Sequence, residues 1–170
     1  DQRSSQHESL LTKLNTMYQQ SLSLSLSSEQ VSDLRKKIIK LANELKQFPE
    51  LQAQSYNIIG RIALDDGFID KAQLYIEKAL KIEPNNPGNL FSYGHIYLYK
   101  NQLKTAIEYF SKAHDIDPFA TKAQSSLAYC YLALNYPEKA FLNYKELVKH
   151  SPKDNHIKSK LFESCSKIKA

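Results

Sequence analysis

Residues 87–120 read PGNLFSYGHIYLYKNQLKTAIEYFSKAHDIDPFA, and this 34-residue stretch decides the fold. The segments on either side, residues 53–86 and 121–154, align with it without a gap. A fixed period of about 20–50 residues predicts a repeat protein, in which each unit is one supersecondary element stacked on the next. The three segments together cover 102 of the 170 residues.

Small, turn-forming, large and helix-ending residues recur at fixed positions of the three segments. Small residues are needed where antiparallel helices approach closely, Gly and Asn tolerate the left-handed conformation of a tight turn, and Pro ends a helix. These residues are Gly60, Gly94 and Ala128 at position 8; Gly67, Asn101 and Asn135 at position 15; Ala72, Ala106 and Ala140 at position 20; Ile76, Phe110 and Tyr144 at position 24; and Pro84, Pro118 and Pro152 at position 32. Each segment therefore predicts a helix, a tight turn, a second helix and a proline stop.

This pattern resembles the tetratricopeptide repeat, whose signature includes a small residue at position 8, Ala at position 20, an aromatic residue at position 24 and Pro at position 32. The resemblance implies an all-α fold, a right-handed superhelical solenoid of antiparallel helix pairs. We expect an N-terminal helical hairpin packed on the first repeat and a C-terminal capping helix. The expected parts are residues 1–52 (hairpin), 53–86, 87–120 and 121–154 (repeats) and 155–170 (cap).

The segments outside the repeats also carry helical patterns. Apolar residues predict helices over about residues 5–20 and 29–48, the second starting at a capping box of Ser27 and Gln30. The intervening SLSLSLSS stretch is expected to be a connector, because no other strand exists to pair with it. At the other end, an apolar stripe predicts a terminal helix over residues 155–169; its members are Ile157, Leu161, Cys165 and Ile168.

Composition agrees with helices joined by few turns. The chain has only 4 Gly and 6 Pro, too few for a sandwich, barrel or alternating α/β fold. Its length predicts one domain, and its 42% hydrophobic and 24% charged residues are those of a globular protein. Because residue 1 is Asp and not Met, we expect a processed chain or a fragment.

Charge and cysteine content limit the partners. The formal net charge of +5 is concentrated toward the ends, without the one-sided basic face and stacking aromatics of a nucleic-acid-binding surface, so we expect no nucleic-acid partner. The sequence has no apolar run near the roughly 20 residues that span a bilayer, so we expect no membrane insertion. Cys130 and Cys165 lie on apolar stripes and have no ligand spacing, which predicts reduced, buried thiols and a cytoplasmic location.

Partner-binding residues follow from the resemblance, which implies that the first helix of each repeat lines a concave groove. The expected contact residues are Asn57, Arg61, Phe91, His95, Tyr99, Lys122 and Tyr129. Phe91 and Tyr99 could instead pack on neighbouring helices or on a folded-back terminus. Some members of the family hold acidic chaperone tails, but only Lys122 of the five corresponding residues matches, so such a clamp is not expected.

We expect neither catalysis nor a cofactor or metal. The histidines lack metal-ligand spacing, and three of the four glycines have repeat positions, which leaves no phosphate-binding loop. The leading hypothesis is a protein-interaction scaffold or adaptor that binds a peptide or helix of a partner protein in the groove. The alternative is a regulatory or substrate-docking module of a larger enzyme, such as a methyltransferase or glycosyltransferase. Self-association through the N-terminal helices is a further hypothesis.

Overall fold

The computed structural model describes residues 2–170, with side chains from residue 4 onward, and these residues form helices and connecting turns without a strand. The chain divides into two compact units, Asp1–Pro84 and Asn85–Ala170. Each helix pair of a repeat protein packs only against its neighbours, so several local cores replace one central core.

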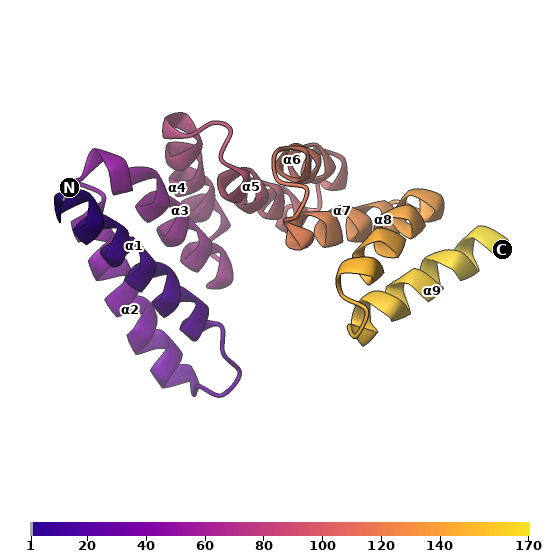
Figure 1. Ribbon diagram of the computed structural model, residues 1–170, viewed down its shortest axis with the longest axis horizontal. Coiled ribbons are helices and arrows are strands. Elements are labelled where there is room, and N and C mark those ends of the chain that lie inside the picture. Colours follow the sequence, from indigo (N-terminus) through magenta and orange to yellow (C-terminus); the bar gives the residue numbers. More distant parts are fainter. Residues whose placement is uncertain (1) are drawn as a thin grey trace. The chain divides into compact units, whose positions relative to one another are not determined.

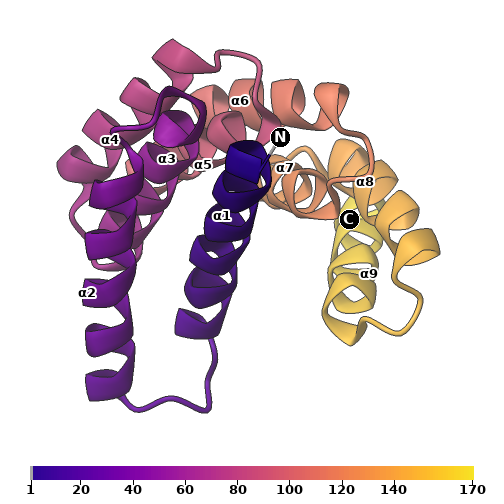
Figure 2. The same ribbon diagram turned by 60° about the vertical axis from the view of Figure 1, so that its left-hand side comes forward.

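The first unit contains four helices (Figure 1), namely α1 (Gln2–Ser21), α2 (Ser28–Leu45), α3 (Pro49–Asp65) and α4 (Ile69–Ile82). Figure 2 shows α1 and α2 side by side and antiparallel, joined by the connector that the SLSLSLSS stretch predicts. The capping box is confirmed: the Ser27 hydroxyl accepts the Gln30 N–H at 3.2 Å, and the Gln30 side chain accepts the Ser27 N–H at 2.8 Å.

The boundary between α2 and α3 differs from the sequence prediction. The second helix ends at Leu45, although the sequence predicted a helix to residue 48. The next helix begins at Pro49, before residue 53, so it extends into the segment expected to belong to the hairpin. Proline has no N–H to lose at the first position of a helix and its fixed φ suits that position, so Pro49 begins α3 instead of only ending α2.

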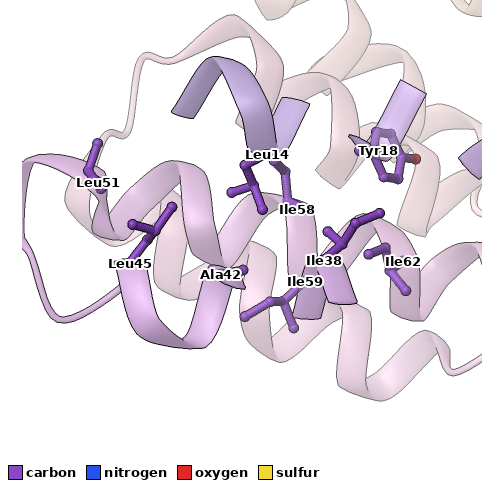
Figure 3. Close-up of a cluster of buried hydrophobic side chains, with 9 residues drawn as sticks. All are labelled: Leu14, Tyr18, Ile38, Ala42, Leu45, Leu51, Ile58, Ile59 and Ile62. Atoms are coloured by element: carbon purple, nitrogen blue, oxygen red, sulfur yellow. The ribbon is translucent and has the colours of Figure 1, made fainter. Parts of the chain in front are cut away.

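The core of the first unit is built by three helices together (Figure 3). Apolar side chains from α1, α2 and α3 meet in one buried cluster. The cluster thus joins the helix that precedes the connector in the sequence to the two helices that follow it. Its members are Leu14, Tyr18, Ile38, Ala42, Leu45, Leu51, Ile58, Ile59 and Ile62. The hydrophobic free energy of this cluster therefore holds α1 and α2 against α3, at roughly 25 cal/mol per Å² of buried apolar area.

The second unit contains five helices, namely α5 (Pro87–Tyr99), α6 (Leu103–Ile116), α7 (Thr121–Ala133), α8 (Pro137–His150) and α9 (Asn155–Lys169). Phe110 and Cys130 are fully buried in a cluster that joins α6 to α7. A second cluster joins α7, α8 and α9 and includes Tyr144 and Ile157. The helix-pair organisation expected from the repeats is therefore present, and the all-α fold class is confirmed.

The predicted turn residues adopt the left-handed conformation. The backbone φ is 83° at Gly67, 57° at Asn101 and 59° at Asn135, each just after the first helix of its pair. Position 32 prolines stand just beyond the second helices, which end at Ile82, Ile116 and His150. The local chemistry read from the sequence thus sets where each helix of a repeat begins and ends.

The space left by the position 8 glycines is filled by the large residue at position 24. A Cβ added to Gly94 would lie 2.6 Å from Cε1 of Phe110, and one added to Gly60 would lie 2.7 Å from Cδ1 of Ile76. The backbone oxygen of Ala72, at position 20, also lies 3.2 Å from the Cβ that would be added at Gly60. The nearest obstacle to a Cβ at position 8 is therefore the large side chain at position 24.

The terminal helix is formed as predicted, but its buried side differs from the predicted stripe. Ile157 and Ser164 are its buried residues, while Cys165 is half-buried and Ile168 is exposed. Successive residues turn by about 100°, so Ile157 and Ser164, seven apart, share a side that faces α8. The expectation that both thiols are buried is therefore wrong for Cys165.

Candidate functional site

The two candidate residues of the first unit, Asn57 and Arg61, lie on α3 beside the core. Asn57 is only 8% exposed. The Arg61 guanidinium lies 4.2 Å from the centre of the Tyr18 ring, in a cation–π contact with α1. The side chain of Arg61 is thus held by the N-terminal hairpin.

A polar network continues from Tyr18 to α2. The Tyr18 hydroxyl donates a hydrogen bond of 2.9 Å to Asp65. Asp65 lies 3.8 Å from the Arg35 guanidinium, which also pairs with Asp66. Burial raises the pKa of Tyr18 to about 12; the charge of Arg61 opposes the shift and that of Asp65 adds to it. These contacts fix α1 and α2 to the C-terminal end of α3.

Sequence reasoning missed Tyr18 and Arg35. Both lie outside the three repeats, where no register relates one helix to the next. A pocket of about 510 Å³, open to solvent, also lies beside Arg35 and is lined by α2, Leu26 of the connector and Asp66. None of the seven candidate residues borders it.

In the second unit, Phe91 and His95 rest on the core. The ring centres of Phe91 and His95 are 4.6 Å apart, and they lie 5.7 and 5.1 Å from that of Phe110. The His95 Nε2 lies 3.4 Å from the Ser126 hydroxyl on α7. Both side chains are half-buried, so they combine a packing role with a partly open edge.

Tyr99, Lys122 and Tyr129 are the exposed candidates. The exposed fractions of the tyrosines are 57% for Tyr99 and 49% for Tyr129. Residues three or four apart share one side of a helix, which places three residues of α5 in one row and three of α7 in another. We call these two rows the α5–α7 face; its residues are Phe91, His95, Tyr99, Lys122, Ser126 and Tyr129.

The two rows form one surface. His95 in the middle of the α5 row contacts Ser126 in the middle of the α7 row. Tyr99 and Tyr129 therefore stand on the same side of the second unit, above a base of half-buried rings.

On α9, Glu163 pairs with two of the four lysines. Lys160 Nζ lies 2.8 Å from Glu163, which also lies 3.8 Å from Lys167. The hydrogen bond from Lys160 lowers the pKa of Glu163. Burial, with a smaller contribution from Glu163, raises the pKa of Tyr144 to about 12. Among the described residues no acidic side chain pairs with Lys122, which leaves this cation open to a ligand.

The described residues contain no group of three metal-ligating side chains. Among them there is also no helix both long and apolar enough to cross a bilayer. Burial raises the pKa of the Cys130 thiol to about 11, so this cysteine is a packing residue and not a ready nucleophile. The arrangement offers aromatic surface and one cation for binding.

Comparison with known proteins identifies the repeat. Two family models described as tetratricopeptide repeat match residues 53–86 and 75–108. The chain is 32% identical over 108 residues to the general transcriptional corepressor ssn6 of Schizosaccharomyces pombe, which covers 61% of this chain. It is 27% identical over 124 residues, 69% of this chain, to trafficking protein particle complex subunit 12 of Mus musculus. The chain spans only 10% and 16% of these two relatives.

Solved structures with the same fold are more distant in sequence. The first TPR of Spaghetti (RPAP3), bound to the HSP90 peptide SRMEEVD, has a TM-score of 0.66 at 19% identity, covering 69% of this chain and 94% of that chain. The crystal structure of MamA has a TM-score of 0.68 at 12% identity, covering 83% and 84%. At these identities the likeness shows the fold.

Proposed function

We propose that this chain, whose residues 53–108 match tetratricopeptide repeat models, binds a peptide or helix of a partner protein on the α5–α7 face. Tetratricopeptide repeat domains are protein-interaction modules. The exposed pair Tyr99 and Tyr129 carries this function. Tyrosine is enriched among residues that dominate binding energy, because it offers a large, stiff apolar surface together with a hydroxyl.

The surroundings of the two tyrosines favour a ligand held by packing. Phe91 and His95 supply partly open rings between them, and Ser126 supplies a hydroxyl. Lys122 can pair with an acidic group of the ligand and so fix its register. The expected ligand is a segment with apolar or aromatic side chains and one acidic residue.

The first unit makes a smaller contribution in this account. Arg61 is stacked on Tyr18 and Asn57 is almost covered, so a ligand would have to displace α1 to use the guanidinium fully. A solved neighbour binds the HSP90 peptide SRMEEVD, whose acidic residues call for several cations. Lys122 is the only match to that pattern here, which argues against an acidic chaperone tail as ligand.

Selection from a displayed peptide library against the 170-residue protein tests this function. Selected peptides are then measured by fluorescence anisotropy against Tyr99→Ala, Tyr129→Ala and the double variant Phe91→Ala/Tyr129→Ala. Each single variant is expected to weaken binding by about tenfold or more, since about 1.4 kcal/mol corresponds to a factor of ten.

Tyr136→Ala is the matched control. Tyr136 is 47% exposed, close to the 49% of Tyr129, but it stands at the start of α8, outside the α5–α7 face. Its replacement should leave the affinity unchanged. If the folded double variant Phe91→Ala/Tyr129→Ala keeps the affinity of the wild type, the ligand binds elsewhere and the assignment is wrong.

A further inference from the structure

The terminal helix α9 packs in the same register as the first helix of each repeat. Position 3 is buried in all four of these helices, and so is position 10. The residues are Ser55, Asn89, Ala123 and Ile157 at position 3, and Ile62, Ile96, Cys130 and Ser164 at position 10. Position 8 of α9 must therefore point where position 8 points in the repeats, toward the place of a second helix.

Position 8 of α9 is Phe162, which is 75% exposed. In the repeats this position holds Gly60, Gly94 or Ala128, each buried beneath its second helix. Even a Cβ at Gly94 would lie 2.6 Å from the Phe110 ring. A whole phenyl group at position 8 therefore excludes a second helix packed as in the repeats.

The side of α9 that carries Phe162 is nevertheless apolar at its centre. Lys158, Phe162, Cys165 and Lys169 follow one another at spacings of four, three and four residues, which places them on one side of the helix. We call this side the α9 outer face. Its apolar centre has a lysine at each end, and the lysines are separated by about 16 Å of helix, roughly three turns.

The charge on the α9 outer face is not neutralised within the helix. Glu163, the only acidic residue of α9, pairs with Lys160 and Lys167 on another side. Among the described residues no acidic side chain forms an ion pair with Lys158 or Lys169. A second copy of the chain would bring lysines against lysines in either helix direction, which disfavours self-pairing.

We propose that the α9 outer face binds an amphipathic helix with acidic residues on both flanks of its apolar stripe. A partner helix can cross α9 at a greater distance than the second helices of the repeats do, because Phe162 stands between the two helices. The apolar side chains of the partner helix then bury the phenyl ring. Its carboxylates then meet Lys158 and Lys169. A membrane surface fits less well, because the exposed apolar stripe is narrow and Ser159 and Ser166 lie beside it.

Two synthetic helices test this interaction with the 170-residue protein. Each is a fluorescein-labelled peptide of about 18 residues, or five turns, with a leucine stripe flanked by Glu in one and by Lys in the other. Anisotropy should show the Glu peptide binding about tenfold or more tightly than the Lys peptide. Phe162→Ser should weaken the Glu peptide about tenfold, and Lys158→Glu/Lys169→Glu should reverse the preference.

Leu142→Ser is the control. Leu142 is 64% exposed on α8 and lies two residues, or about 200°, from Tyr144, which packs in the cluster shared with α9. This variant should bind the Glu peptide as the wild type does. Circular dichroism should show all variants folded, since Phe162 and both lysines are exposed.

Five outcomes overturn the inference. The two peptides bind equally, or Phe162→Ser leaves the Glu peptide unaffected. Tyr129→Ala, but not Phe162→Ser, abolishes binding, which assigns the peptide to the α5–α7 face. Alternatively, the protein forms a dimer in sedimentation equilibrium, or binds phosphatidylserine vesicles, in a way that depends on Phe162, which gives the face another occupant.

Discussion

Replacing Gly94 by Ala tests the close approach of α5 and α6. The new Cβ would lie 2.6 Å from Cε1, 2.7 Å from Cδ1 and 3.2 Å from Cζ of Phe110. The Phe110 side chain is fully buried, so the ring can move only by displacing its neighbours. Either the ring rotates away from its preferred rotamer or the two helices separate.

The expected cost is the difference between two opposing effects. Overpacking of a core costs roughly 1–3 kcal/mol, while Ala is favoured over Gly inside a helix by roughly 0.5–1 kcal/mol. The third repeat holds Ala128 opposite Tyr144, which shows that a Cβ fits at this position when the helices are spaced for it. Taking the middle of each range, we expect Gly94→Ala to lower the free energy of unfolding by about 1 kcal/mol.

Urea denaturation followed by far-UV circular dichroism measures this change. Gly60→Ala is the matched variant, whose new Cβ would lie 2.7 and 2.8 Å from Cδ1 and Cγ1 of Ile76 and 3.2 Å from the backbone oxygen of Ala72. Its cost should be smaller, because the end of the Ile76 side chain can rotate away more easily than a buried phenyl ring. The double variant Gly94→Ala/Phe110→Leu should be less destabilised than the sum of its two single variants. If Gly94→Ala is as stable as the wild type, the close contact with Phe110 does not limit this position.

Three further predictions concern the turn, the tyrosines and the thiols. Asn101→Ala should destabilise the protein by about 1 kcal/mol in urea denaturation while Asn101→Gly should not, because φ is 57° at this position and a Cβ is strained there; equal stability of the two variants contradicts the assignment. Ultraviolet absorbance should show Tyr18 and Tyr144 ionising near pH 12, and ionisation of all tyrosines near pH 10 would contradict this prediction. Because the pKa values of the two tyrosines are raised in the folded state, their contribution to stability is present below pH 10 and is lost between pH 10 and 12. Titration with a thiol reagent at neutral pH should label Cys165 and spare Cys130, whose pKa is raised to about 11, until the protein unfolds; fast labelling of both contradicts it.

Features that depend on local chemistry could be predicted from the sequence. Asn101 and Asn135 adopt the expected left-handed turn, and Pro118 stands just beyond the end of α6. Such signals act within a few residues, and the 34-residue period repeats them three times. The start of α3 at Pro49 was missed because proline also begins helices, and the sequence alone did not distinguish the two roles.

Contacts between elements without a common register could not be predicted. The stacking of Arg61 on Tyr18 depends on how α1 packs against α3, and α1 shows no repeat signature. The burial of Ile157 and Ser164 defines which side of α9 packs against the second unit, and only this side shows that Phe162 takes the place of the small residue at position 8. The sequence identified Tyr99 as a candidate for binding but left open whether its side chain is exposed or packed, because burial depends on the neighbouring helices.

Hydrogen–deuterium exchange with and without a selected peptide tests the central claim most directly, that the α5–α7 face is the binding surface. Binding should slow exchange in α5 and α7, around Tyr99 and Tyr129, and leave the second helices of the pairs, α4 and α6, unchanged. Protection confined to α4 and α6, or to the first unit alone, would contradict the claim.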